Sequence, residues 1–268
     1  AFMKIQKPVY YGDYLQLHWS FRNDVLNNYM TNGLNHGTGQ NNNSITLGFK
    51  STANRIYNNI LERAENTFLY AAGSAGNVYA YNYATGSFAS TGSPNPIGTG
   101  TYAHGAHGQF NLQEGNIDSE NWYDVIHGTQ SENTSFRNWW IGTNFICTPN
   151  GNPAPRTTVS CGAGAWAIHG AEGILVGSLA TTINMVGDVV GSAVQNTLST
   201  GPAIPVIKWN TTKSFNTPYG LSFGYCSGGD TGSCSFDSTT AFTTSFIHGL
   251  YNNIDGSTTW ASGITQNL

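Results

Sequence analysis

The sequence predicts a mainly β protein, and three observations carry this prediction. Apolar and polar residues alternate along several stretches, most regularly over residues 14–21, as in a half-buried strand. Charged residues are only 9% of the chain, against about 25% in ordinary soluble proteins. Aromatic residues reach 13%, enough to bury a sizeable core. This composition is typical of extracellular β proteins, and a net charge of −4 without a basic cluster argues against nucleic acid as a partner.

Four cysteines fall into two local pairs, Cys147/Cys161 and Cys226/Cys234. Their even number and the low charge favour disulfides formed in an oxidising compartment. A Cys147–Cys161 bridge would close a loop of about 15 residues and contribute roughly 3 kcal/mol. Zinc is the alternative, although no Cys-x-x-Cys occurs. We expect a secreted protein whose signal peptide has been removed, without a conventional membrane span.

Two stretches have helical periodicity. In residues 53–65, Ile56, Ile60 and Ala64 would share one helix face. In residues 172–198, apolar residues recur every three or four positions, with glycines that would permit close packing. We interpret 172–198 as a buried helix or core hairpin. The alternative is a segment for subunit packing or membrane insertion.

A weak internal repeat is suggested by aromatic residues followed by an apolar pattern and a glycine. They are Phe68, Trp122 and Trp166, about 50 residues apart but unevenly spaced. Repeats of this length indicate a repeat architecture. Chance recurrence among 34 aromatic residues is the alternative.

The N-terminal stretch resembles β-trefoil modules of the fascin-like and MIR type. The resemblance is carried by residues 11–17, Tyr-Gly-Asp-Tyr-Leu-Gln-Leu, and residues 29–33, Tyr-Met-Thr-Asn-Gly. It implies a trefoil-like binding region. We therefore expect a β-trefoil-like or sandwich region over 1–170, a smaller β-rich region over 171–268, and one or two helices.

The segment from Cys147 to Trp166 is similar to a loop of shufflon-type minor pilins and phage tail-fibre tips. Both contain Cys-x-Pro-Asn-Gly followed by Ser-Cys and a tryptophan. Those proteins are surface-presented adhesins, so the resemblance implies a role in attachment.

The sequence also contains candidate catalytic and metal-binding motifs. The Gly-x-Cys-x-Gly-Gly stretch at 224–229 fits a nucleophile elbow, but no helix can follow it, and Cys234 offers its thiol a disulfide partner. His104 and His107 form a candidate metal pair, with a simple exposed loop as the alternative. Sequons at Asn42, Asn133 and Asn210 are glycosylation candidates. We expect no enzymatic activity and no cofactor.

Aromatic side chains next to amides are suited to sugars, since rings stack on sugar C–H faces and amides bond hydroxyls. Tyr79, Tyr81 and Tyr83 alternate and would lie on one sheet face, and Trp139 and Trp140 form a second aromatic group. A core role is the alternative for this face.

We therefore predict a secreted or cell-surface, non-catalytic, lectin-like adhesin that recognises glycans or a cell-surface receptor and self-associates. The first alternative is a structural subunit of an extracellular filament, fibre or capsid. The second is a pore-forming toxin that contacts membranes through 172–198. The sequence does not identify the ligand or the symmetry of an assembly.

Overall fold

A computed structural model describes residues 3–6, 13–31, 43–87, 100–142, 172–192, 207–209, 219–225 and 238–261. Within these ranges the regular structure is mainly β-strand, with one short helix, α2 (Ser238–Thr244). The mainly β prediction is confirmed. No helix of the described residues has the length and apolar character needed to cross a membrane.

The strands form three large sheets and one small one. Sheet 1 contains β1 (Met3–Gln6), β4 (Asn28–Thr31), β7 (Ile60–Glu62), β10 (Tyr83–Thr85), β14 (Ile117–Asp118), β18 (Trp139–Trp140), β21 (Val189–Val190), β25 (Leu250–Asn252) and β26 (Ser257–Thr259). Sheet 2 contains β2 (Leu15–His18), β5 (Asn43–Gly48), β8 (Asn66–Ala71), β11 (Thr101–His104), β15 (Asn121–Tyr123), β19 (Glu172–Gly177), β23 (Tyr219–Tyr225) and β22 (Ile207–Trp209).

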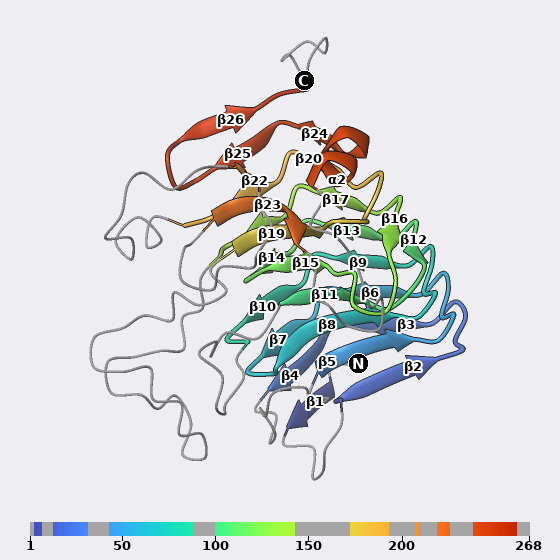
Figure 1. Ribbon diagram of the computed structural model, residues 1–268. Coiled ribbons are helices and arrows are strands. Elements are labelled where there is room, and N and C mark those ends of the chain that lie inside the picture. The colour runs from blue at the N-terminus through green and yellow to red at the C-terminus, as the bar shows by residue number, and fades with distance from the viewer. Residues whose placement is uncertain are drawn as a thin grey trace, which may run out of the picture.

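Sheet 3 contains β3 (Asp24–Leu26), β6 (Arg55–Tyr57), β9 (Val78–Ala80), β13 (Leu112–Glu114), β17 (Thr134–Phe136), β20 (Asn184–Val186) and β24 (Phe246–His248). The small sheet pairs β12 (Gly108–Gln109) with β16 (Gln130–Ser131). The chain visits sheets 2, 3 and 1 in turn and then repeats the circuit, so strands from successive circuits lie side by side (Figure 1).

This path defines a parallel β-helix. The described pairings are parallel, apart from the pairing of β25 with β26 near the C-terminus. Sheet 3 has seven strands, one from each circuit, so the described residues form seven coils. Each coil buries its inner face only against its neighbours, as in other solenoids. The three sheets run without interruption across the predicted boundary at residue 170, because β19 pairs with β15 and β21 with β18.

The interior of the coils is filled by inward-facing side chains from all three sheets. Phe68 of β8 and Tyr79 of β9 stack with ring centroids 4.2 Å apart and an interplanar angle of 1°. Trp140 is fully buried, and its Nε1 donates to Ser135 Oγ at 3.0 Å. The apolar core therefore extends along the length of the solenoid.

Two columns of asparagines, buried except at Asn23 and ending in one case at Asp188, run along the axis at two corners of the coils. Ladder 1 consists of Asn23, Asn54, Asn77, Asn111 and Asn133, in which each Nδ2 donates to the Oδ1 of the next member. Ladder 2 consists of Asn28, Asn59, Asn82, Asn116, Asn138 and Asp188, joined in the same way. Such ladders satisfy the polar groups that the corners bury.

Left-handed backbone makes these corners tight. The residue before each of the first five members of ladder 2 has a positive φ, for example Asn27 (59°), Asn58 (57°) and Gly115 (61°). Asn and Gly adopt this conformation at low cost. The ladders lie five residues apart in the first five coils, so each asparagine closes a corner at which the strand direction changes.

Several predictions fail against this architecture. The predicted helix over 53–65 is wrong, since these residues include β6 and β7. Of the three residues assigned to one helix face, Ile56 and Ala64 are fully buried in the coil interior, whereas Ile60 is 45% exposed, so their four-residue spacing does not mark one buried face. The trefoil-like and sandwich arrangements are not confirmed, because both need extensive antiparallel pairing.

The described part of 172–198, up to residue 192, forms β19, β20 and β21 in three different sheets. The predicted buried helix or hairpin is therefore wrong here. Ile174, Met185 and Val190 are fully buried in the core. These apolar residues hold the coils together, which leaves none of the three available for membrane insertion in the folded chain.

The proposed aromatic repeat does not follow the coils. Phe68 lies beside Thr101 in sheet 2, whereas Trp122 lies beside Tyr102. The two aromatic residues are thus one position out of register and lie on opposite faces of the sheet. Trp166 lies outside the described residues.

Candidate functional site

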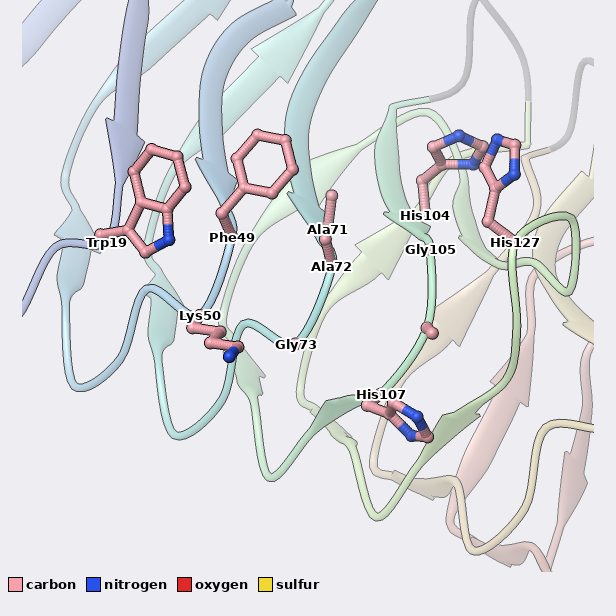
Figure 2. Close-up of a pocket in the computed structure, with 11 residues that line it drawn as sticks. Trp19, Phe49, Lys50, Ala71, Ala72, Gly73, His104, Gly105, His107 and His127 are labelled. Atoms are coloured by element: carbon pink, nitrogen blue, oxygen red, sulfur yellow. The ribbon is translucent and has the colours of Figure 1, made fainter.

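A cleft of about 620 Å³ lies at the ends of the sheet 2 strands and the turns that follow them (Figure 2). Its described lining is Trp19, Phe49, Lys50, Ala71, Ala72, Gly73, His104, Gly105, Ala106, His107 and His127. These residues come from the first five coils in order, so the cleft runs along the solenoid axis. With strands about 4.8 Å apart, four steps give a length of roughly 19 Å.

One end of the cleft is aromatic. Trp19 and Phe49 follow β2 and β5, and their rings stack with centroids 5.2 Å apart and an interplanar angle of 17°. The two side chains are 73% and 46% exposed. Both residues have left-handed backbone, with φ of 46° and 47°, which is uncommon for bulky side chains. The left-handed backbone at these two positions thus directs both aromatic rings outward.

The other end carries imidazoles. His104 ends β11, and Asp124 directly follows β15, the neighbouring strand of sheet 2. His104 Nδ1 lies 2.6 Å from Asp124 Oδ2, and the Tyr102 hydroxyl donates to the same oxygen at 2.5 Å. The Asp124 side chain is fully buried, whereas that of His104 is 27% exposed. His127 packs edge-on against His104, with ring centroids 4.6 Å apart.

The electrostatic character of the cleft differs from that of the whole chain. The protein has a net charge of −4, yet its described cleft lining contains Lys50 and three histidines and no carboxylate. The Lys50 side chain extends over Gly73, since a Cβ on that glycine would lie 3.6 Å from Lys50 Cγ. The cleft therefore complements a ligand with acidic groups.

The aromatic residues singled out in the sequence do not form one surface. Tyr79 and Trp140 are buried in the core, with 1% and 0% exposure, so the prediction that they bind ligand is wrong. Tyr81 and Tyr83 are exposed, but Tyr81 lies in a corner between β9 and β10. The corner breaks the strand alternation, so the three tyrosines do not share a face. Trp139 is partly buried and donates from Nε1 to the carbonyl of Gly191.

His104 and His107 do line one cleft, as their spacing suggested, but His104 pairs with Asp124. No group of three or more His, Cys, Asp or Glu able to hold a metal ion occurs among the described residues. Asn133 is fully buried in ladder 1, so it is not accessible for glycosylation in the folded protein. The other sequons, Asn42 and Asn210, and all four cysteines (Cys147, Cys161, Cys226 and Cys234) lie outside the described residues.

Sequence reasoning missed Trp19, Phe49, Lys50, Asp124 and His127 as partners in one site. Trp19 was interpreted as an inward strand residue, because the alternation over 14–21 does not show that β2 ends at His18. The available signal was an aromatic residue directly after a strand in two successive coils.

The chain was compared with protein-family models, with curated proteins and with solved structures, and none of them matches. The site is therefore interpreted from its own geometry.

Proposed function

We propose that the protein binds an extended glycan in the cleft, as a lectin-like protein of the cell surface or extracellular space. The observation that carries the proposal is the stacked and exposed pair formed by Trp19 and Phe49 at one end of the cleft. Exposed rings bind sugar C–H faces, while polar groups farther along bond the hydroxyls.

The shape of the cleft supports a linear ligand. Its lining takes residues from five successive coils, so a polymer lying parallel to the axis would meet Trp19 first and His127 last. The floor between them consists of small residues, which are Ala71, Ala72 and Gly73 in the third coil and Gly105 in the fourth. At Gly105, φ is 92° and a Cβ would lie 3.0 Å from the Ala72 amide nitrogen, so a side chain is disfavoured there. A low floor leaves room for a chain of sugars.

The adhesin role and the extracellular location are part of the proposal. The low share of charged residues, 9% of the chain, supports them. A role as a filament subunit is the competing proposal, and it predicts assembly of the purified protein without any glycan.

The test is a polysaccharide array probed with the wild-type protein and with Trp19→Ala and Phe49→Ala. We expect each variant to lose about tenfold or more in affinity for the glycans bound by the wild type, since stacking contributes about 1–3 kcal/mol. Phe110→Ala is the matched control, because Phe110 is also a left-handed, 59% exposed aromatic residue but does not line the cleft.

Binding that survives both cleft substitutions, or that falls equally with Phe110→Ala, would contradict the proposal. So would the absence of glycan binding together with filaments in sedimentation and electron microscopy, which would favour the structural role.

A further inference from the structure

His104 is held by the buried carboxylate of Asp124, and glycan binding alone does not require such a pair. Asp124 is fully buried at a point where its carboxylate accepts hydrogen bonds from both His104 and Tyr102. Burying a carboxylate is costly unless it is paired. The pair therefore fixes one imidazole at the cleft wall in one orientation.

The same contact sets the tautomer of His104. An ionised carboxylate only accepts, so Nδ1 carries the proton that is donated to Asp124. Nε2 is left as the acceptor, and the structure gives it no hydrogen bond to a described residue. Since Nε2 lies across the ring from the buried Asp124, this lone pair is on the cleft side. A neutral imidazole oriented by a buried carboxylate is a general base.

The described lining limits what such a base can act on. It contains no Ser, Thr or Cys that His104 could activate as a nucleophile. It also lacks the two carboxylates that most glycoside hydrolases use. A base without either partner acts directly on the ligand. In a sugar chain the acidic C–H bond is the one next to a carboxylate, and Lys50 in the described lining favours a ligand of that kind.

We propose that the cleft cleaves 4-linked acidic glycans by β-elimination, with His104 as the catalytic base, Asp124 as its positioning residue and Lys50 as the partner of the sugar carboxylate. This inference rests on the proposed glycan-binding function and departs from the expectation of a non-catalytic protein.

In this reaction His104 Nε2 takes the proton from C5 of a uronate residue. The C–H electron pair forms the C4–C5 double bond, and the C4–O bond breaks. The oxygen leaves with the neighbouring chain, takes a proton from water and becomes a new reducing end. His104 then returns its proton to water. Lys50 stabilises the negative charge that develops at the carboxylate in the transition state. The step needs no oxidant or reductant.

The experiment incubates the full chain with polygalacturonate, alginate and a neutral glucan, and follows the ultraviolet absorbance of the conjugated unsaturated uronate. We expect product from an acidic polymer and none from the glucan. His104→Ala should abolish the product and leave binding of the same polymer within about threefold, because a general base contributes mainly to the chemical step.

Asp124→Asn tests the positioning role. It preserves the shape of the side chain but favours the wrong tautomer of His104, so we expect kcat to fall about 100-fold or more, with KM little changed and the pH profile of kcat shifted. Phe110→Ala is the control outside the cleft, since Phe110 does not line it, and it should retain kcat within a few-fold. Thermal unfolding of each variant separates these effects from loss of fold.

The outcomes distinguish the two proposals. Binding of acidic polymers without unsaturated product would overturn the elimination and leave the binding function intact. Equal rates for wild type and His104→Ala would also overturn it, as would release of ester groups without chain cleavage, which would make water the target of the base. Failure to bind any polymer would remove both proposals.

Discussion

The two asparagine ladders have the same spacing but end differently. Successive members are separated by 31, 23, 34 and 22 residues in both ladders. Ladder 1 ends at Asn133, whose Nδ2 has one acceptor among the described residues, the carbonyl of Gly108 at 3.0 Å. Ladder 2 continues to Asp188, whose Oδ1 accepts from Asn138, while its Oδ2 has no hydrogen bond to any residue that the structure describes.

The comparison shows that hydrogen-bond donors and acceptors are paired within a ladder, and that an unpaired group lies at its last member. Each interior asparagine donates once to a backbone carbonyl of the preceding coil and once to the next member, so the interior is satisfied. The last member lacks a successor. Ladder 1 therefore ends with a spare donor beside an apolar coil, where Ile183 is fully buried, and ladder 2 ends with a spare acceptor.

The largest effect is expected from breaking a ladder in its interior. Asn82→Ala removes two hydrogen bonds accepted from Asn59 and two donated by Nδ2, to Ile56 and Asn116. The buried amide of Asn59 would lose its acceptor, so we expect a loss of about 3–5 kcal/mol in the free energy of unfolding. Chemical denaturation measures it.

Asn77→Ala is the control for this substitution, since Asn77 has the same four bonds in ladder 1. The two losses should agree within about 1 kcal/mol. A clearly smaller loss in one ladder would show that the two columns do not carry equal parts of the stability.

The next effect concerns the end of ladder 2. Burial raises the pKa of Asp188 to about 7, above the value of about 3.9 in an unfolded chain. The folded protein thus holds this proton more tightly. The stabilisation linked to it is complete below about pH 4 and is lost as the pH rises through 7. An asparagine would not ionise and would supply the missing donor.

Asp188→Asn should therefore stabilise the protein at pH 8 by on the order of 2 kcal/mol and have little effect at pH 5. Denaturation midpoints of both proteins across this range would measure the difference. Asp118, whose pKa burial raises to about 6, titrates in the same direction in both proteins and cancels. A gain that is equal at both pH values would contradict the role assigned to ionisation.

The smallest effect is expected at the first member of ladder 1. Asn23 is partly exposed and donates to Asn54 at 3.0 Å, but it accepts from no preceding coil of the described residues. Asn23→Ala should cost less than about 1 kcal/mol, because solvent replaces the lost bond. A loss as large as that of Asn82→Ala would mean that the ladder does not weaken toward its ends.

Part of this fold could be predicted from the sequence. Composition and alternation indicated the β class, and a five-residue Asn-x-x-x-x-Asn spacing occurs at 23/28, 54/59, 77/82, 111/116 and 133/138. That spacing was overlooked because the distances between coils vary, which hides a period. In 53–65 and 172–192, apolar residues that recur every three or four positions also predicted helices, although the described residues of both ranges form strands.

The candidate site was harder to predict from the sequence than the fold class was. Its residues are separated by up to about a hundred positions and meet only because sheet 2 stacks β2, β5, β8, β11 and β15 in order. Asp124 follows a strand whose inward and outward positions the sequence does not fix. Its contact with His104 depends on the parallel register of β11 and β15.

The ladders also have a polarity. Every hydrogen bond between two ladder members is donated toward the C-terminal coil, so the side-chain dipoles of each column point the same way. A coil inserted in the interior would have to supply an acceptor to the coil before it and a donor to the coil after it. An ionised Asp188 meets the first requirement and fails the second. Asp188 is therefore the last member of ladder 2 among the described residues, and the column of side-chain amides ends at its carboxylate.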